Sequence, residues 1–209
     1  MVSKDSKLIF LMPPKTASNS LRDSLMSSKI KFDRFDPKYH KPNTHLYLSE
    51  LVENFKIDNI DDYKILQVYR NPFEKFRSAF YHFQVLIPYH FKVTKMKLND
   101  FVLHYKDCIT SENYINCMYD EPSYVYDLIE RKINFGCTRY FVEQYKWNDL
   151  DKNVNYIDIS DIDNLCEIIG YNIPKIGKLN VFRHTKEELN DTSIEIIQNL
   201  YHKDFGLKK

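Results

Sequence analysis

Two stretches of the chain each place hydroxyl and cationic side chains directly after a short apolar run. In the first, residues 8–12 are continuously apolar, and Pro13-Pro14 ends the run just before Lys15. An apolar run of this length is typical of a buried strand in a parallel sheet. Leu21 and Leu25 then follow at helical spacing. The sequence therefore predicts a strand, a tight loop and a helix that begins near residues 16–18.

The start of this helix has the composition of an anion site. Its first turn contains Thr16, Ala17, Ser18, Asn19 and Ser20. Backbone N–H groups without an intrahelical partner and the positive end of the helix dipole attract anions there, and Lys15 adds a full charge. The loop lacks the glycines and the Gly-Lys-Ser/Thr ending of a nucleoside-triphosphate loop. It is P-loop-like only in its order of strand, loop and helix. The alternative is an ordinary helix with a serine cap.

The second stretch repeats this order. Residues 64–69 are predicted to form a strand, and Arg70 falls at its carboxyl end, where open α/β sheets bind ligands. Asn71 is a good N-cap, and Pro72 suits the first helical position. Ser78 lies on the polar side of this helix and could share one phosphate with the Arg70 guanidinium. The alternative is a surface arginine and an incidental serine. Together, the two stretches suggest one ligand with two anionic ends.

The remaining pattern predicts an α/β fold. Helical stripes occur at 48–55 and 194–201, and a further strand is expected at 154–159, followed by a helix from Ser160 to Gly170. Alternating strands and helices indicate a mainly parallel central sheet flanked by helices, in one domain spanning 1–209. One apolar stripe should pack against this sheet; it contains Phe73, Phe76, Phe80 and Phe83.

Composition excludes several classes of protein. The 209 residues carry a formal net charge of +1, so a strongly basic nucleic-acid binder is disfavoured. No apolar stretch reaches the length of a membrane span, and residues 1–5 do not begin a signal peptide. A cytoplasmic protein is therefore expected. The four cysteines show no metal-ligand spacing, so no metal site is expected.

Taken together, the two stretches resemble the sulfotransferases that use 3′-phosphoadenosine 5′-phosphosulfate (PAPS). Residues 15–20 are similar to the family's 5′-phosphosulfate loop, and Arg70-Asn71-Pro72 followed by Ser78 to its 3′-phosphate signature. The Pro-Lys-Thr-Ala loop most resembles that of the carbohydrate (glycan) sulfotransferases, although many members have Gly-Thr where this chain has Ser18-Asn19. The resemblance implies transfer of a sulfuryl group from PAPS to an acceptor hydroxyl, on a carbohydrate or other small molecule, with 3′,5′-ADP as product.

Weaker similarities follow downstream. Residues 138–144 are similar to the family segment that precedes the late strand, and the resemblance assigns a phosphate contact to Arg183 in a late loop. Residues 88–122 are rich in aromatic side chains. They are either an insertion that binds the acceptor or helices whose aromatic side chains form core.

The chemistry requires a base for the acceptor hydroxyl and a cation at the leaving phosphate. The resemblance assigns Lys15 to the phosphate and His45 to the base, because His45 lies between the loop and Arg70 and just precedes the 48–55 helix. His40 is the second candidate base. No metal is required. Two other functions stay open: a small-molecule kinase with an atypical phosphate loop, and a non-catalytic nucleotide-binding module.

Overall fold

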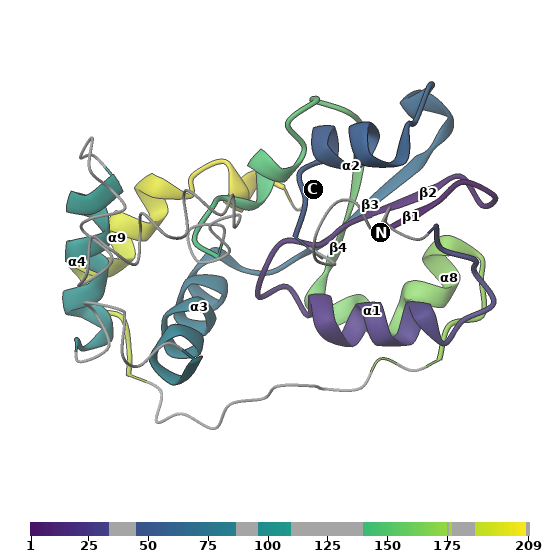
Figure 1. Cartoon of the computed structure of the whole chain (residues 1–209). Helices are drawn as coiled ribbons and strands as arrows, with labels where there is room; N and C mark the ends of the chain where they lie inside the picture. Colours follow the sequence, from purple (N-terminus) through teal and green to yellow (C-terminus); the bar gives the residue numbers. More distant parts are fainter. Residues whose placement is uncertain (34–44, 87–95, 110–139, 175, 177–186, 208–209) are drawn as a thin grey trace. The chain divides into compact units, whose positions relative to one another are not determined.

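A computed structural model describes residues 1–33, 45–86, 96–109, 140–174, 176 and 187–207 (Figure 1). The chain divides into two compact units. The first contains Met1–Arg70, Val142–Val181 and Gly206–Lys209, and the second contains Asn71–Phe141 and Phe182–Phe205. Each unit is described by itself below, so a single domain over 1–209 stays a prediction.

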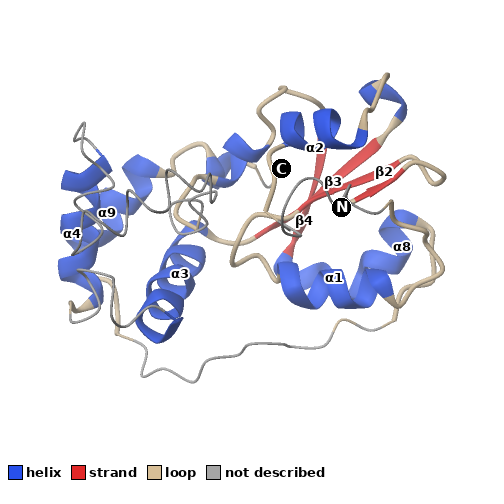
Figure 2. Cartoon of the chain, viewed as in Figure 1, coloured by secondary structure: helices blue, strands red, loops and turns tan. Residues whose placement is uncertain are grey.

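The first unit is built on a four-stranded sheet (Figure 2). Its strands stand in the order β1 (Val2–Ser3), β2 (Leu8–Leu11), β3 (Lys64–Tyr69) and β4 (Val154–Asp158). The pairs β2–β3 and β3–β4 are parallel, and only β1 runs antiparallel to its neighbour. The α/β class and the mainly parallel sheet are therefore confirmed. The two-residue β1 was not predicted, because so short a strand has no periodicity of its own.

Helices cover both faces of this sheet (Figure 1). On one face, α1 (Ser18–Met26) and α8 (Leu165–Ile169) pack against the strands; on the other lies α2 (Leu48–Phe55). Alternate strand residues explain the two cores, since successive side chains of a strand point to opposite faces. The α1 side buries Phe10, Leu21, Leu25, Leu66, Val68 and Leu165. The α2 side buries Ile9, Leu11, Leu48, Leu51, Phe55 and Ile65.

The region after β4 differs from its prediction. Residues Ile159–Asn164 form a 3-10 helix (η3), and α8 begins only at Leu165. The cap of η3 is the Asp158 carboxylate, which accepts from the Ser160 N–H at 2.8 Å, so the expected Ser160 cap is wrong. The physical reason is that an aspartate at a strand end readily bonds the N–H two residues on. The end at Gly170 is confirmed, where φ is 73°.

The described part of the second unit is helical. It contains α3 (Pro72–Leu86), α4 (Leu98–Ile109) and α9 (Asp191–Leu200), and the 3-10 turn Asp204–Gly206 follows α9 along the chain. As predicted, Asn71 caps α3, its side chain accepting from the Phe73 N–H at 3.0 Å.

The core of this unit corrects the expected packing of the phenylalanine stripe. It contains Phe76, Phe80, Phe101, Val102, Tyr105, Phe141, Ile197 and Tyr201, and none of the described strand residues. Phe76 and Phe80 thus pack against the neighbouring helices, because aromatic side chains on α4 supply an apolar partner that the stripe alone did not reveal. Within 88–122, Phe101 and Tyr105 are therefore core; residues 88–95 and 110–122 lie outside the described residues. No helix in the described parts is long and apolar enough to cross a membrane.

Candidate anion-binding site

The three parallel strands of the first unit end at the same edge of the sheet. β2 ends at Leu11, β3 at Tyr69 and β4 at Asp158, and the register pairs Tyr69 with Asp158. Ligands of open α/β sheets bind outside the carboxyl ends of the strands. The loop 12–17 and Arg70 follow directly on two of these ends. The loop and Arg70 therefore begin at the edge of the sheet where folds of this class bind their ligands.

The loop after β2 has a backbone suited to an anion. Lys15 and Ala17 are left-handed, with φ of 65° and 59°, whereas Thr16 between them is not. Such a conformation disfavours a residue with a Cβ by roughly 1–2 kcal/mol. Backbone that alternates in this way turns successive N–H groups toward one point and forms an anion-binding concavity. Strain of this kind is characteristic of ligand sites.

The Thr16 hydroxyl holds this loop closed. The side chain is only 1% exposed, and Oγ1 donates to the Pro13 carbonyl at 2.7 Å. A hydroxyl has one proton to donate, and here that proton is used inside the loop. In this arrangement Thr16 can offer a ligand its backbone N–H, but its hydroxyl cannot also donate to a phosphate.

The helix start that follows is electrostatically suited to a negative ligand. The N-cap of α1 is Ala17, which makes no side-chain cap bond, and the first turn contains no acidic residue. The alternative of a serine-capped helix is therefore wrong. The first helical bond joins the Leu21 N–H to the Ala17 carbonyl at 2.9 Å, so the N–H groups of residues 18–20 precede the regular ladder. The Ser18 and Ser20 side chains are buried, and Asn19 is exposed.

Arg70 meets the loop although 55 positions separate it from Lys15. Its Nη1 donates to the Lys15 carbonyl at 3.0 Å. Burial and, to a smaller extent, the neighbouring Arg70 charge lower the pKa of Lys15 to about 8. Two cations held this closely disfavour each other, and a bound anion relieves that repulsion. The site is therefore arranged for a negative ligand.

Gln144 holds the main chain of Arg70. It is fully buried in the 3-10 helix η2 (Gln144–Trp147). Its Oε1 accepts from the Arg70 N–H at 2.8 Å, and its Nε2 donates to the Arg70 carbonyl at 2.7 Å. Sequence reasoning missed this role, because a lone glutamine carries no periodic signal. The only hint was the weak similarity of 138–144 to the family.

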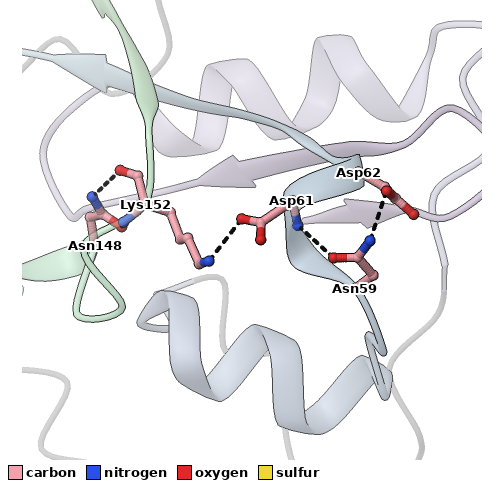
Figure 3. Close-up of polar contacts among 5 residues, drawn as sticks. All are labelled: Asn59, Asp61, Asp62, Asn148 and Lys152. Carbon is pink, nitrogen blue, oxygen red and sulfur yellow. Dashed lines mark hydrogen bonds and ion pairs between the residues drawn. The ribbon is translucent and has the colours of Figure 1, made fainter.

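A second clasp holds the segment between η2 and β4 (Figure 3). The Asn148 amide donates to the Lys152 carbonyl at 2.6 Å and accepts from its N–H at 3.0 Å. Lys152 Nζ in turn contacts Asp61 Oδ1 at 2.7 Å, and the Asp61 N–H donates to Asn59 at 3.3 Å. These bonds hold residues 148–152, which connect η2, where Gln144 lies, to β4.

His45 lies beside the same loop. Its Nδ1 is 2.7 Å from the Met12 carbonyl oxygen. A carbonyl can only accept, so Nδ1 carries the proton, and in the neutral ring the lone pair is on Nε2. The ring also meets Trp147 edge-on, with centroids 6.5 Å apart. This is the tautomer that a base acting through Nε2 requires.

The other candidate residues lie in the second unit or outside the described residues. Ser78 is half-buried on α3, in the second unit. His40 and Arg183 lie outside the described residues. The described parts of the chain contain no group of three or more His, Cys, Asp or Glu side chains placed to hold a metal ion.

Comparison with known proteins identifies no family. No protein-family model matches the chain, and no curated protein matches it. Among solved structures, a sulfotransferase from Alicyclobacillus acidocaldarius is similar at 14% sequence identity, over 95% of this chain and 83% of that chain, with a TM-score of 0.32. A likeness this distant does not decide the activity of this chain.

Proposed function

We propose that this protein is a sulfotransferase that transfers a sulfuryl group from PAPS to an acceptor hydroxyl, on a carbohydrate or other small molecule. The observation that carries the proposal is the meeting of Lys15 and Arg70, whose hydrogen bond of 3.0 Å joins two strand-to-helix connections at one edge of the sheet. Cations on two connections suit a ligand with two anionic groups. The resemblance of the same two segments to the PAPS-binding motifs supports that ligand.

The loop and Arg70 bind different ends of the nucleotide. The N–H groups of residues 15–20 and the Lys15 ammonium bind the 5′ end, and the Arg70 guanidinium binds the 3′-phosphate. Ser78 and Arg183 remain candidates for further phosphate contacts on the sequence resemblance alone. Lys15 also stabilises the negative charge that develops on the phosphate as the sulfuryl group leaves.

His45 prepares the acceptor. Its Nε2 accepts the hydroxyl proton while the acceptor oxygen bonds to sulfur and the bond from sulfur to the phosphate oxygen breaks. The products are the sulfated acceptor, 3′,5′-ADP and a protonated His45. The Nδ1–H bond to Met12 keeps the ring oriented through this step.

The first test is a thermal-shift comparison of 3′,5′-ADP with 5′-ADP and ATP. A ligand present at 1,000 times its dissociation constant adds about 4 kcal/mol to the free energy of unfolding. We expect selective stabilisation by 3′,5′-ADP, followed by transfer from labelled PAPS to a carbohydrate acceptor. Stabilisation by ATP alone would favour a kinase, and 3′,5′-ADP binding without transfer to any acceptor would favour a non-catalytic module.

The variant Arg70→Ala should lose most of the preference for 3′,5′-ADP over 5′-AMP. It removes a charge-assisted contact of about 1.5–3 kcal/mol, which corresponds to a factor of roughly 10 to 150 in affinity. Arg22→Ala is the matched control, because Arg22 is a partly exposed arginine on α1 that pairs with Asp23. Unchanged selectivity in Arg70→Ala contradicts the 3′-phosphate assignment.

Nucleotide affinity should also fall as the pH rises above about 8. The pKa of Lys15 is lowered to about 8, and the phosphates bind its protonated form. Above this pKa the free protein must take up a proton to bind, so affinity falls by up to tenfold per pH unit until the higher pKa of the complex is passed. Calorimetry between pH 7 and 9.5, in buffers of different ionisation enthalpy, measures both the affinity and the proton uptake. Lys15→Arg stays charged over this range and should abolish the dependence.

A further inference from the structure

Arg70 is the first residue beyond the end of the sheet ladder. The last register pair of β3 and β4 is Tyr69 with Asp158. None of the described strands pairs with the Arg70 main chain beyond this point, and the side chain of Gln144 bonds to it instead. Its amide offers the same pair of groups as a peptide, one N–H donor and one carbonyl acceptor, at 2.7 and 2.8 Å.

A side chain of the sheet holds Gln144 in turn. The Gln67 Nε2, in β3, donates to the Gln144 carbonyl at 2.9 Å. Gln67 is buried, and its Oε1 finds no partner among the described residues. An unsatisfied buried acceptor is unfavourable, and an apolar side chain would avoid it. The amide at position 67 is therefore better explained by the bond it gives to Gln144 than by packing.

These bonds form a continuous chain to the loop. Gln67 holds Gln144, Gln144 holds the Arg70 main chain, and the Arg70 side chain holds the Lys15 carbonyl. Lys15 is left-handed, which disfavours a residue with a Cβ, and the bond that its carbonyl accepts from Arg70 helps to hold it in that conformation. Gln144 therefore supports both the direction of the Arg70 guanidinium and the conformation of the loop.

We propose that Gln144 is a positioning residue that directs Arg70 toward the ligand and, through Arg70, keeps the loop at Lys15 in its anion-binding conformation. This inference deepens the proposed function and rests on it for the identity of the ligand. Gln144 itself does not touch the reacting atoms. Its effect is on selectivity for the 3′-phosphate and on the surroundings of Lys15.

The test is Gln144→Met, which keeps the length of the side chain and removes both bonds to Arg70. We expect the preference for 3′,5′-ADP over 5′-AMP to fall at least tenfold. In the protein without nucleotide, we expect the Lys15 pKa, followed by NMR of its side-chain resonances, to rise above the wild-type value. A merely structural residue would lower the melting temperature and leave both readouts unchanged, and that result would overturn the proposal.

Asn148→Ala is the matched control. Asn148 clasps the main chain of Lys152 through the same pair of amide bonds (Figure 3), so its bonds hold Lys152 rather than Arg70. Its loss should lower stability without changing the Lys15 pKa or the nucleotide preference. Equal changes in Asn148→Ala and Gln144→Met would also overturn the proposal, because they would then report general loosening of the segment.

If the methionine variant does not fold, Gln144→Glu tests the same proposal. A protonated glutamic acid can accept from the Arg70 N–H and donate to its carbonyl, whereas the ionised form can only accept. The Arg70 amide resonance should therefore stay near its wild-type position at low pH and depart from it as the pH rises. A resonance that matches wild type throughout would contradict the clasp. If the wild-type protein binds no 3′,5′-ADP, the proposed function fails, and the Lys15 pKa and the Arg70 resonance still decide the role of Gln144.

Discussion

We expect Lys15→Met to lower the rate of sulfuryl transfer by a factor of about 10² or more while it raises the melting temperature at pH 7. The loss of rate follows from removing the cation at the leaving phosphate, since one such electrostatic contact contributes on this scale. Methionine matches the lysine side chain as far as Cε, lacks only the ammonium group, and should leave the left-handed backbone unchanged. Initial rates with saturating PAPS and a thermal melt measure the two effects.

The gain in stability follows from the sign of the pKa shift. The pKa of Lys15 is about 8 in the folded protein and about 10.5 in the unfolded chain, so the unfolded chain binds more protons between these values. The free energy of unfolding therefore rises with pH across this window. Below it, at pH 7, the folded protein holds a charge that its surroundings disfavour. An uncharged residue removes that penalty, for a gain on the order of a few degrees.

Lys7→Met is the control for this prediction. Lys7 precedes β2 in the same left-handed conformation, with φ of 51°, but it lies at the surface and pairs with Asp62 at 3.9 Å. Its replacement should leave the transfer rate unchanged. If Lys15→Met kept its activity and melted at a lower temperature than wild type, Lys15 would be a structural residue.

The second large effect is expected at His45. Both His45→Ala and His45→Asn should lower turnover by a factor of about 10² or more and leave the affinity for 3′,5′-ADP unchanged. Asparagine can still donate to the Met12 carbonyl but cannot take a proton from the acceptor. Loss of activity in both variants therefore assigns the effect to the base rather than to the orientation of the loop. Turnover and nucleotide titration together make the comparison.

A surface histidine supplies the control. His202 is exposed, and its Nδ1 also lies near a backbone carbonyl, 3.1 Å from that of Asn199. His202→Ala should keep full activity. If His45→Ala were active and His40→Ala inactive, the base would be His40 and not His45.

Local signals were enough to predict much of the fold. The apolar run 8–12 predicted β2, and Arg70-Asn71-Pro72 marked the end of β3 and the start of α3. Asn71 caps that helix as expected, because the bond to Phe73 spans only two residues. The helix after β4 was predicted too long, because the Asp158 cap favours a 3-10 turn before α8.

The residue order alone was enough to predict β2, β3, β4 and the helices α1, α2, α3 and α9, and to place the cationic and hydroxyl side chains at the carboxyl edge of the sheet. These features depend on neighbours within a few positions, where propensity and capping act. The three-dimensional fold was needed to show that Arg70 reaches the Lys15 carbonyl, that Gln144 holds Arg70 across 74 positions and that His45 donates to Met12. The fold was also needed to show that Phe76 packs against α4 and α9. Such contacts join distant residues through single hydrogen bonds or shared burial, and no local pattern records them.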